Sequence, residues 1–310
     1  LPPSKGATNM DVYPRGGHAP GMPVIATAAA RADYGSTRDQ TMSDKPELAV
    51  PAGPRSTTEK MLSVRYWTDK LLSFSISRPA GFKFTPGHYA RVGIGDSDGN
   101  RIWRPLSIVS DSREDHLEFF VILVPDGAFS GVLAQARVGD PVGCESLPFG
   151  FMTIDAFAPG KDLWLLASGT GLGPYLSILR DPATWQAFEN VVVVHSVREA
   201  AELAYREEIA AIGKEISTGQ AIDRVRYVPV VTREAAAGAL PARIPQLIED
   251  GRLERAAGLT LTPEDSRIMV CGNPDMAREL RALLTGRGFK TNRRLAPGQL
   301  VFENYWQNKR

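Results

Sequence analysis

Residues 163–179 read LWLLASGTGLGPYLSIL, and this stretch decides the fold of the C-terminal half of the chain. It opens with the continuous apolar run Leu163–Ala167, passes through the glycine-rich segment Ser168–Pro174 and ends in a helix-like stretch, Tyr175–Arg180. A fully apolar strand is typical of a sheet that helices cover on both faces. A strand, a glycine-rich turn and a helix in this order present backbone N–H groups that can receive a phosphate.

The residues that follow repeat this alternation of strand and helix. Predicted strands cover Val191–Val194, Val225–Val231 and Arg267–Cys271, and predicted helices cover Glu199–Ile212, Ile244–Asp250 and Asp275–Leu284. Apolar strands that alternate with helices predict an α/β doubly wound parallel sheet, which binds ligands at the carboxyl ends of its strands.

The glycines of the turn, Gly169, Gly171 and Gly173, have the spacing G-x-G-x-G and not the G-x-G-x-x-G of the dinucleotide fingerprint. Glycines let a pyrophosphate approach the main chain closely, although a purely structural tight turn explains the same pattern. The end of the next strand carries Arg198 and no convincing acidic residue. An arginine there suits a 2′-phosphate, so the sequence favours NADP over NAD.

Two further arginines, Arg233 and Arg243, follow the next predicted strand. For any one of them a solvated surface position is the alternative. If the three converge on one edge of the sheet, they form a site for a 2′-phosphate.

The N-terminal half has a different pattern, in which short β-like runs are separated by turn residues. These runs are Met61–Trp67, Leu71–Ser77, His88–Ile94, Leu106–Ser110 and Leu117–Val124, with one short helix predicted at Phe129–Ala136. Such a pattern predicts a closed antiparallel β-barrel. We therefore expect two domains, the barrel over residues 56–157 and the parallel-sheet domain over residues 158–310.

Residues 1–55 are rich in Ala, Gly, Pro, Ser and Thr and show no sustained period of 2 or 3.6. A segment of this composition buries too little apolar surface to offset its ordering entropy, which predicts a disordered leader or extension. An arm that docks onto the body or onto a partner is the alternative. Met42 is a plausible native start.

The barrel half contains two candidate anion-binding elements. In Trp103–Ser110 we expect Arg104 and Ser107 to share one face of a strand, with an anion beside the arginine and a hydrogen-bond acceptor beside the serine. The segment Pro125–Ser130 predicts a second phosphate cradle, a turn that opens a helix with unpaired N–H groups. Together with the glycine-rich turn, these elements indicate two bound dinucleotides.

The composition excludes several other classes of protein. The formal net charge of +1 gives no global case for nucleic-acid binding. Cys144 and Cys271 form no CxxC pair, and with four histidines the chain has no readable metal site, iron–sulfur cluster or disulfide framework. Redox chemistry therefore requires a bound organic cofactor. Without a membrane-length apolar run or a signal peptide, we expect a cytoplasmic location.

Several motifs together resemble the bacterial ferredoxin/flavodoxin–NADP reductases, members of the FAD-dependent ferredoxin–NADP reductase superfamily. Arg104-Pro-Leu-Ser107 is similar to the R-x-Y-S/T flavin motif, and residues 163–179 are similar to the pyridine-nucleotide loop. Further similar segments are His195–Arg198, Val231–Glu234, Ala242–Pro245, Val270–Met276 and Phe302–Trp306. The resemblance covers about residues 58–306 in the family's order and leaves out the leader.

The resemblance implies non-covalent FAD in the barrel and NADP(H) on the sheet domain, with no metal. The FAD contacts that it implies are Arg104, Pro105, Leu106, Ser107, Phe120, Val121, Ile122, Leu123, Ala128, Phe129, Ser130, Thr170, Tyr305 and Trp306. The NADP contacts that it implies are Gly169, Gly171, Val197, Arg198, Thr232, Arg233, Arg243, Cys271, Gly272, Asn273, Pro274 and Asp275. Arg104 would pair with the FAD pyrophosphate, and Ser107 and Cys271 would be catalytic. A buried small residue is the alternative for Cys271, and packing of a terminal tail is the alternative for Tyr305 and Trp306.

The chain departs from the family pattern at two places. Leu106 stands where the motif has a tyrosine, so an aliphatic shelf replaces the aromatic one, and we expect FAD to bind with altered redox tuning. Gln307–Arg310 extend past the tryptophan with which close relatives end, which puts the stacking role of Trp306 in question.

The activity that the resemblance implies is hydride transfer between NADPH and FAD N5, followed by single-electron exchange with ferredoxin or flavodoxin. The protein is expected to act as a monomer. One alternative is the reductase component of an oxygenase or a free-flavin reductase. Another is a binding or regulatory module without turnover.

Overall fold

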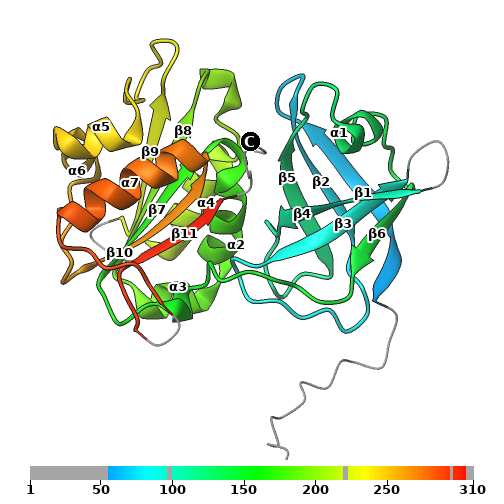
Figure 1. Cartoon of the computed structure of the whole chain (residues 1–310), viewed down its shortest axis with the longest axis horizontal. Helices are drawn as coiled ribbons and strands as arrows, with labels where there is room; N and C mark the ends of the chain where they lie inside the picture. Colours follow the sequence, from blue (N-terminus) through cyan, green and yellow to red (C-terminus); the bar gives the residue numbers. More distant parts are fainter. Residues whose placement is uncertain (1–54, 96–99, 219–222, 294–295, 305–310) are drawn as a thin grey trace, which may run out of the picture. The chain divides into compact units, whose positions relative to one another are not determined.

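The computed structural model of the chain describes residues 55–95, 100–218, 223–293 and 296–304. The predicted leader lies outside the described residues except for Arg55, and so do Tyr305, Trp306 and the extension Gln307–Arg310. The fold class predicted from the sequence is confirmed, because an antiparallel sheet in the first half is followed by a parallel sheet in the second (Figure 1).

The first half is a six-stranded antiparallel sheet with the strand order β4-β3-β6-β1-β2-β5. Its elements are β1 (Ser56–Tyr66), β2 (Leu71–Ser77), β3 (Tyr89–Gly95), β4 (Arg101–Ser107), β5 (His116–Ile122), β6 (Pro141–Glu145) and the helix α1 (Ala128–Leu133). The two edge strands meet through a bridge between Ile108 and Phe119, and the N–H of Val109 donates to the carbonyl of Glu118 at 2.8 Å. The sheet thereby closes on itself around its own core.

Apolar side chains of every barrel strand fill that core. Phe74 on β2 and Phe119 on β5 are almost fully buried, with ring centroids 5.3 Å apart. Pro105 is accommodated because β4 is an edge strand, where a missing N–H removes no ladder bond to a second neighbour.

The second half is a parallel sheet with the strand order β11-β10-β7-β8-β9. Its strands are β7 (Asp162–Ser168), β8 (Asn190–Val197), β9 (Val225–Val231), β10 (Ser266–Gly272) and β11 (Leu300–Asn304). Its α-helices are α2 (Gly173–Arg180), α3 (Pro182–Ala187), α4 (Arg206–Ile216), α5 (Ile244–Glu249), α6 (Arg252–Ala257) and α7 (Pro274–Gly286). Short 3-10 helices are η1 (Ile154–Ala156), η2 (Gly169–Leu172) and η3 (Ala200–Glu202).

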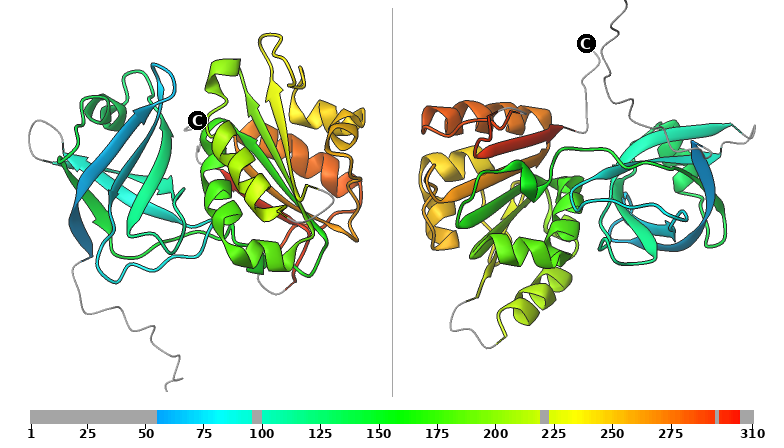
Figure 2. Two further views of the ribbon diagram at one scale, coloured as in Figure 1. Left: turned by 180° about the vertical axis from the view of Figure 1, so that it is seen from behind. Right: turned by 90° about the horizontal axis from the view of Figure 1, so that it is seen from below.

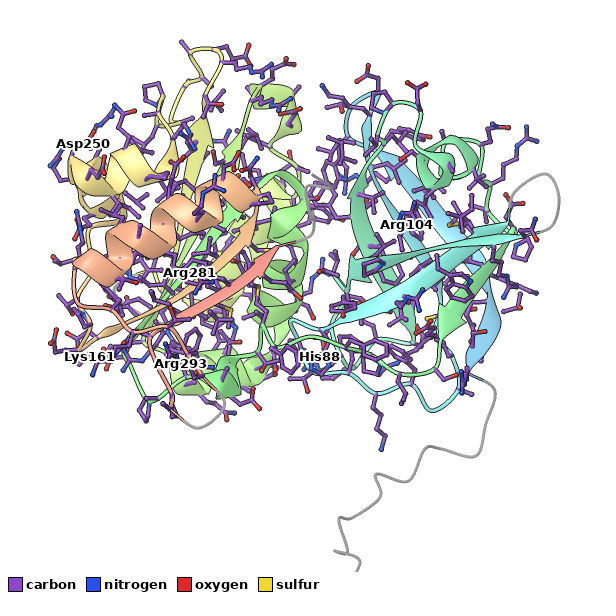
Figure 3. All side chains as sticks on the ribbon, in the orientation of Figure 1. His88, Arg104, Lys161, Asp250, Arg281 and Arg293 are labelled. Carbon is purple, nitrogen blue, oxygen red and sulfur yellow. The ribbon has the colours of Figure 1, made fainter. Side chains whose placement is uncertain are left out.

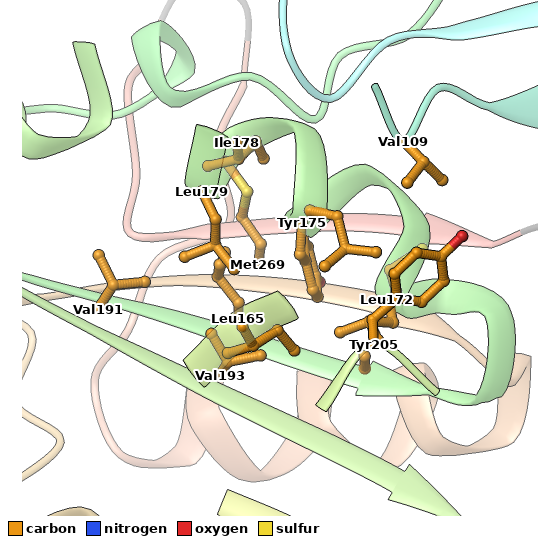
Figure 4. Close-up of a cluster of buried hydrophobic side chains, with 14 of the residues drawn as sticks. Val109, Leu165, Leu172, Tyr175, Ile178, Leu179, Val191, Val193, Tyr205 and Met269 are labelled. Carbon is orange, nitrogen blue, oxygen red and sulfur yellow. The ribbon is translucent and has the colours of Figure 1, made fainter. Parts of the chain in front are cut away.

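Helices cover both faces of this sheet, as Figure 2 shows. On one face α2 and α4 pack against side chains such as Leu165, Val193 and Met269, and Figure 4 shows part of this cluster. On the other face α5, α6 and α7 pack against neighbours such as Leu166 and Val192. Successive residues of β7 and β8 thus enter opposite cores, which is why these strands are apolar throughout.

Several elements differ from the sequence prediction. The sequence did not predict α3, α6 or β11, and β1 begins at Ser56, before the predicted start at Met61. The strand predicted at Leu106–Ser110 is β4, which ends at Ser107 because the chain then turns from β3 toward β5. β6 was missed because it is short and pairs with β1 and β3, which are distant in sequence. The helix predicted over Glu199–Ile212 is broken, since Tyr205 adopts φ +59° and α4 begins only at Arg206.

No helix in the described part of the chain is long and apolar enough to span a bilayer. The predicted domain limit at 157/158 falls in the connection between η1 and β7, and it stays a prediction.

Candidate functional site

A pocket of about 230 Å³ opens beside the end of β4. Its lining residues are Arg104, Pro105, Leu106, Ser107, Phe120, Val121, Ile122, Val124, Gly127, Phe129, Ser130, Leu133 and Thr170. Most of the residues expected to contact FAD therefore gather around one cavity. Leu123 instead packs against the barrel core, and the exposed Ala128 is not part of the lining.

The expectation that Arg104 and Ser107 share a strand face was wrong. Residues three apart in a strand point to opposite sides, and here Arg104 is exposed while Ser107 is 8% exposed. Both still line the pocket, because β4 ends at Ser107 and the cavity wraps around that end. Figure 3 labels Arg104 on the barrel, where its Nη1 donates to the carbonyl of Trp103 at 2.8 Å.

The turn before α1 forms another part of the pocket wall. Asp126 has φ +57°, and the N–H of Gly127 donates to the carbonyl of Val124 at 3.1 Å. The Ser130 hydroxyl oxygen accepts from the N–H of Val124 at 2.8 Å, which fixes the turn and leaves the hydroxyl hydrogen to donate outward. The first N–H groups of α1 lack intrahelical acceptors, as at any helix start, so this wall can take an anion.

Helix α2 holds the parallel sheet against the same end of the barrel. The Ser177 hydroxyl donates to the carbonyl of Ser110 at 2.8 Å, and Arg180 Nη1 donates to that of Val109 at 2.8 Å. A Cβ built on Gly173 would lie 3.8 Å from the Cβ of Ser107. These contacts place Thr170, in η2, on the wall of a pocket that is otherwise built by the barrel.

Gly171 and Gly169 of the loop are glycine for different structural reasons. A Cβ on Gly171 would lie 2.4 Å from the carbonyl oxygen of Cys271, so close packing of β10 against the loop requires glycine there. Gly169 has φ +54°, and a Cβ there would meet nothing within 4 Å. Of these two, Gly169 is therefore the one that leaves space open for a ligand.

Two of the three predicted arginines come together at the carboxyl edge of the sheet. The N–H of Arg233 donates to the carbonyl of Arg198 at 2.9 Å, and the N–H of Thr232 donates to that of Val197 at 3.1 Å. The exposed side chains of Arg198 and Arg233 thus start from adjacent strand ends. Arg243, directly before α5, instead forms an ion pair with Glu279 on α7 at 2.9 Å.

Known proteins share this combination of folds and motifs. The family described as Oxidoreductase FAD-binding domain matches residues 66–152, and the family described as Oxidoreductase NAD-binding domain matches residues 165–282. A ferredoxin–NADP reductase of Pseudomonas aeruginosa is 38% identical over 256 residues, which are 81% of this chain and 98% of the relative. A flavodoxin/ferredoxin–NADP reductase of Escherichia coli is 39% identical over 250 residues, 80% of this chain and 98% of the relative.

The chain belongs to the ferredoxin–NADP reductase family. It is an oxidoreductase with an FAD-binding domain and a domain that binds a pyridine nucleotide. Among solved structures, the ferredoxin NADP+ reductase of Neisseria gonorrhoeae with bound FAD and NADP is 37% identical. It has a TM-score of 0.76 and covers 82% of this chain and 100% of its own.

The segment Cys271–Asp275 covers the end of β10 and the start of α7. Cys271 is fully buried, and glycine is required at position 272, since φ is +125° and a Cβ there would lie 2.3 Å from Ser168 Oγ. Asn273 caps α7 by accepting the N–H of Asp275 at 2.8 Å, and its own N–H donates to Ser168 Oγ at 2.8 Å. This geometry locks the ends of β7 and β10 together, and Cys271 supports the loop through its backbone.

Sequence reasoning quoted Glu303 in the terminal motif but gave it no role. It pairs with Cys271 in the β10–β11 register, and within the described residues its Oε2 is buried without a hydrogen-bond partner. Burial raises the pKa of this carboxyl to about 7. It can therefore take up or release a proton near neutral pH. An acidic residue directly after the apolar run Leu300–Phe302 was the available signal.

Sequence reasoning also missed Tyr205. Its ring lies 4.6 Å from that of Trp67 and meets Phe120 edge-on at 5.1 Å, and its hydroxyl donates to Glu118 Oε1 at 2.8 Å. Phe120 lines the pocket, so Tyr205 supports that wall from the parallel-sheet half. A tyrosine inside a helical pattern gives no sequence signal for this contact.

Proposed function

We propose that this chain transfers electrons between NADP(H) and ferredoxin or flavodoxin, using non-covalently bound FAD. The observation that carries the proposal is the pocket at the end of β4, where an arginine, apolar walls and a loop of the parallel sheet meet. The names of relatives that match this chain over nearly their whole length support it.

The pocket residues fit FAD in both chemistry and arrangement. Phe120, Phe129 and Leu133 provide a buried apolar surface for a planar ring system. Arg104 and the first N–H groups of α1 would hold the pyrophosphate, since both are donors to anionic oxygens. When bound, FAD supplies the redox chemistry, because a flavin exchanges hydride with nicotinamide and single electrons with a carrier.

The carboxyl edge of the parallel sheet fits NADP(H). Arg198 and Arg233 would hold the 2′-phosphate, beside Val197 and Thr232. Gly169, Gly171 and the segment Cys271–Asp275 would line the nicotinamide side. Arg243 would have to break its ion pair with Glu279 to reach the phosphate, so we propose that it contributes less to phosphate binding than Arg198 and Arg233 do.

The role of the protein's own residues is orientation and exclusion of water. Ser107 from the barrel and Thr170 from the parallel-sheet half both line the pocket. The backbone of Cys271 lies so close to Gly171 that the loop packs directly on β10. Leu106 gives the pocket an aliphatic wall at the position of the motif tyrosine.

Rapid mixing of the purified yellow holoprotein with NADPH tests this proposal. We expect the visible flavin absorbance to bleach faster with NADPH than with NADH, and to recover when oxidised ferredoxin or flavodoxin is added. A flavin that stays oxidised with NADPH contradicts the proposal. Turnover of added FMN without any carrier would indicate a free-flavin reductase instead.

We further propose that the protein is a cytoplasmic monomer with ferredoxin or flavodoxin as partner and no role in nucleic-acid binding. The net charge of +1 supports the last point. We also propose that the FAD-binding domain covers residues 56–157 and the NADP-binding domain residues 158–310. Sedimentation of the holoprotein at several concentrations tests the oligomeric state.

A further inference from the structure

His195 is buried in the sheet at a point where no redox role is assigned to it. It lies on β8, is 0% exposed, and follows four consecutive buried valines. Its Nε2 lies 3.2 Å from the carbonyl oxygen of Gly169, and its Nδ1 lies 3.4 Å from the hydroxyl oxygen of Tyr227 on β9. Both ring nitrogens are therefore engaged.

These partners determine which nitrogen carries the proton. A carbonyl oxygen only accepts, so the hydrogen of the neutral ring must be on Nε2. Burial lowers the pKa of His195 to about 4, so the ring is neutral near pH 7. Nδ1 is then an acceptor, and the Tyr227 hydroxyl donates to it.

The carbonyl that His195 holds begins the glycine-rich loop. Gly169 has φ +54°, so the chain turns sharply there as it leaves β7. The next residue, Thr170, lines the flavin pocket. On the opposite side, the loop packs closely on β10, because a Cβ on Gly171 would lie 2.4 Å from the Cys271 carbonyl oxygen. The loop is therefore in close contact with β10 on one side and within hydrogen-bond distance of the imidazole on the other.

We propose that His195 is a positioning residue whose Nε2–H holds the Gly169 carbonyl and thereby keeps Thr170 in the pocket wall. The inference rests on the proposed function only where flavin reduction is its readout. The alternative is that His195 only fills space in the core. That role requires the size of the ring but not the Nε2–H donor.

The decisive comparison uses His195→Leu, which removes the donor, and His195→Gln, which keeps an N–H donor on a side chain of similar reach. Val193→Ala is the matched control, because it loosens the same face of β8 two residues earlier. Each holoprotein is measured by single-turnover flavin reduction at saturating NADPH. Amide hydrogen exchange of the peptide covering residues 168–173 gives a readout that does not depend on activity.

We expect His195→Leu to slow the limiting reduction rate roughly ten- to a hundred-fold, as displacements of about 1 Å at reacting groups do. Exchange in the loop should rise, the dissociation constant for NADPH should change little, and His195→Gln should recover most of the rate. Val193→Ala should lower the melting temperature, while its reduction rate and loop exchange stay near the wild-type values.

The proposal is overturned if His195→Leu matches wild type in both readouts. It is also overturned if His195→Gln folds but is as slow as His195→Leu, or if Val193→Ala is equally slow.

If His195→Leu does not fold, Tyr227→Phe decides, since it removes only the hydroxyl that orients the ring. We expect faster loop exchange and a rate lower by roughly two- to ten-fold, the size of one neutral hydrogen bond. Unchanged loop exchange would overturn the proposal. A wild-type flavin that NADPH does not reduce would instead refute the proposed function, and loop exchange would still test the positioning role.

Discussion

The pocket at the end of β4 and the carboxyl edge of the parallel sheet, the two places proposed to bind dinucleotides, differ in burial and in charge. Three apolar residues of the pocket wall, Phe120, Phe129 and Leu133, are under 8% exposed, and among the described residues that line it Arg104 is the one arginine. The edge presents Arg198 and Arg233 as exposed cations on adjacent strand ends. A resident cofactor is held best by enclosed apolar surface, whereas a nucleotide that must leave is selected best by accessible charge.

The largest expected effect removes the charge from the open edge. In Arg198→Ala/Arg233→Ala we expect the KM for NADPH to rise roughly a hundred-fold or more, because each charge-assisted bond to phosphate contributes about 1.5–3 kcal/mol. The KM for NADH, which lacks that phosphate, should change by less than about three-fold. Steady-state kinetics with both nucleotides measure the difference.

Retention of FAD provides the internal comparison for this variant. The dissociation constant for FAD should stay at the wild-type value, because neither arginine lines the pocket. Arg252→Ala, which removes a half-buried cation at the start of α6 that pairs with Asp250, controls for a general change of charge. Equal effects on the KM for NADPH and the KM for NADH would contradict the assignment of the two arginines to the 2′-phosphate site.

The second prediction concerns the buried part of the parallel sheet, where burial keeps titratable side chains neutral. For His195 the pKa is about 4 in the folded chain against an ordinary value of 6.5. Between these values the unfolded chain binds more protons, so this group's contribution to the free energy of unfolding falls as pH drops from 6.5 to about 4. The full loss is about 3 kcal/mol.

The contribution of Glu303 to the free energy of unfolding changes with pH in the opposite direction. Its pKa is about 7 in the folded chain against an ordinary value of 4.5. The folded chain binds more protons in this range, so the contribution of Glu303 falls by about 3 kcal/mol as pH rises through it. Denaturant unfolding of the holoprotein at fixed excess FAD, from about pH 4 to pH 8, should show the acid slope flattened in His195→Gln. Glu303→Gln should gain stability over wild type on the alkaline side, and parallel curves for all three proteins would contradict these shifts.

The smallest expected effect is a change in the affinity for FAD, which we propose binds in the pocket at the end of β4. Leu106→Tyr places an aromatic ring where the family motif has one, and stacking adds about 0.5–1.5 kcal/mol beyond area burial. We expect FAD to bind roughly two- to ten-fold more tightly, measured by fluorescence quenching during titration of the apoprotein. Leu106→Met, similar in size but without a ring, should stay near wild type. Weaker binding by Leu106→Tyr would mean that neighbouring side chains already fill the space for the ring.

Local sequence predicted the elements whose limits depend on neighbouring residues. The bounds of β2 and β9 agree with prediction, since each is a short run rich in apolar residues. The interruption at Tyr205 could not be predicted, because its cause is contact with Trp67 and Phe120, far away in the chain. The same holds for Gly171, which is fixed by a carbonyl one hundred residues later.

By itself the sequence determined the class of protein and the two half-folds, and it supplied the candidate residues of both proposed nucleotide sites, because strand periodicity, turn chemistry and motif spacing are local properties. Only the tertiary structure decided which of those residues meet. It joined Arg198 to Arg233 and paired Arg243 with Glu279, and it buried His195 under the loop that carries Thr170. Such pairings depend on strand order and on burial, which arise from contacts between segments that the sequence keeps apart.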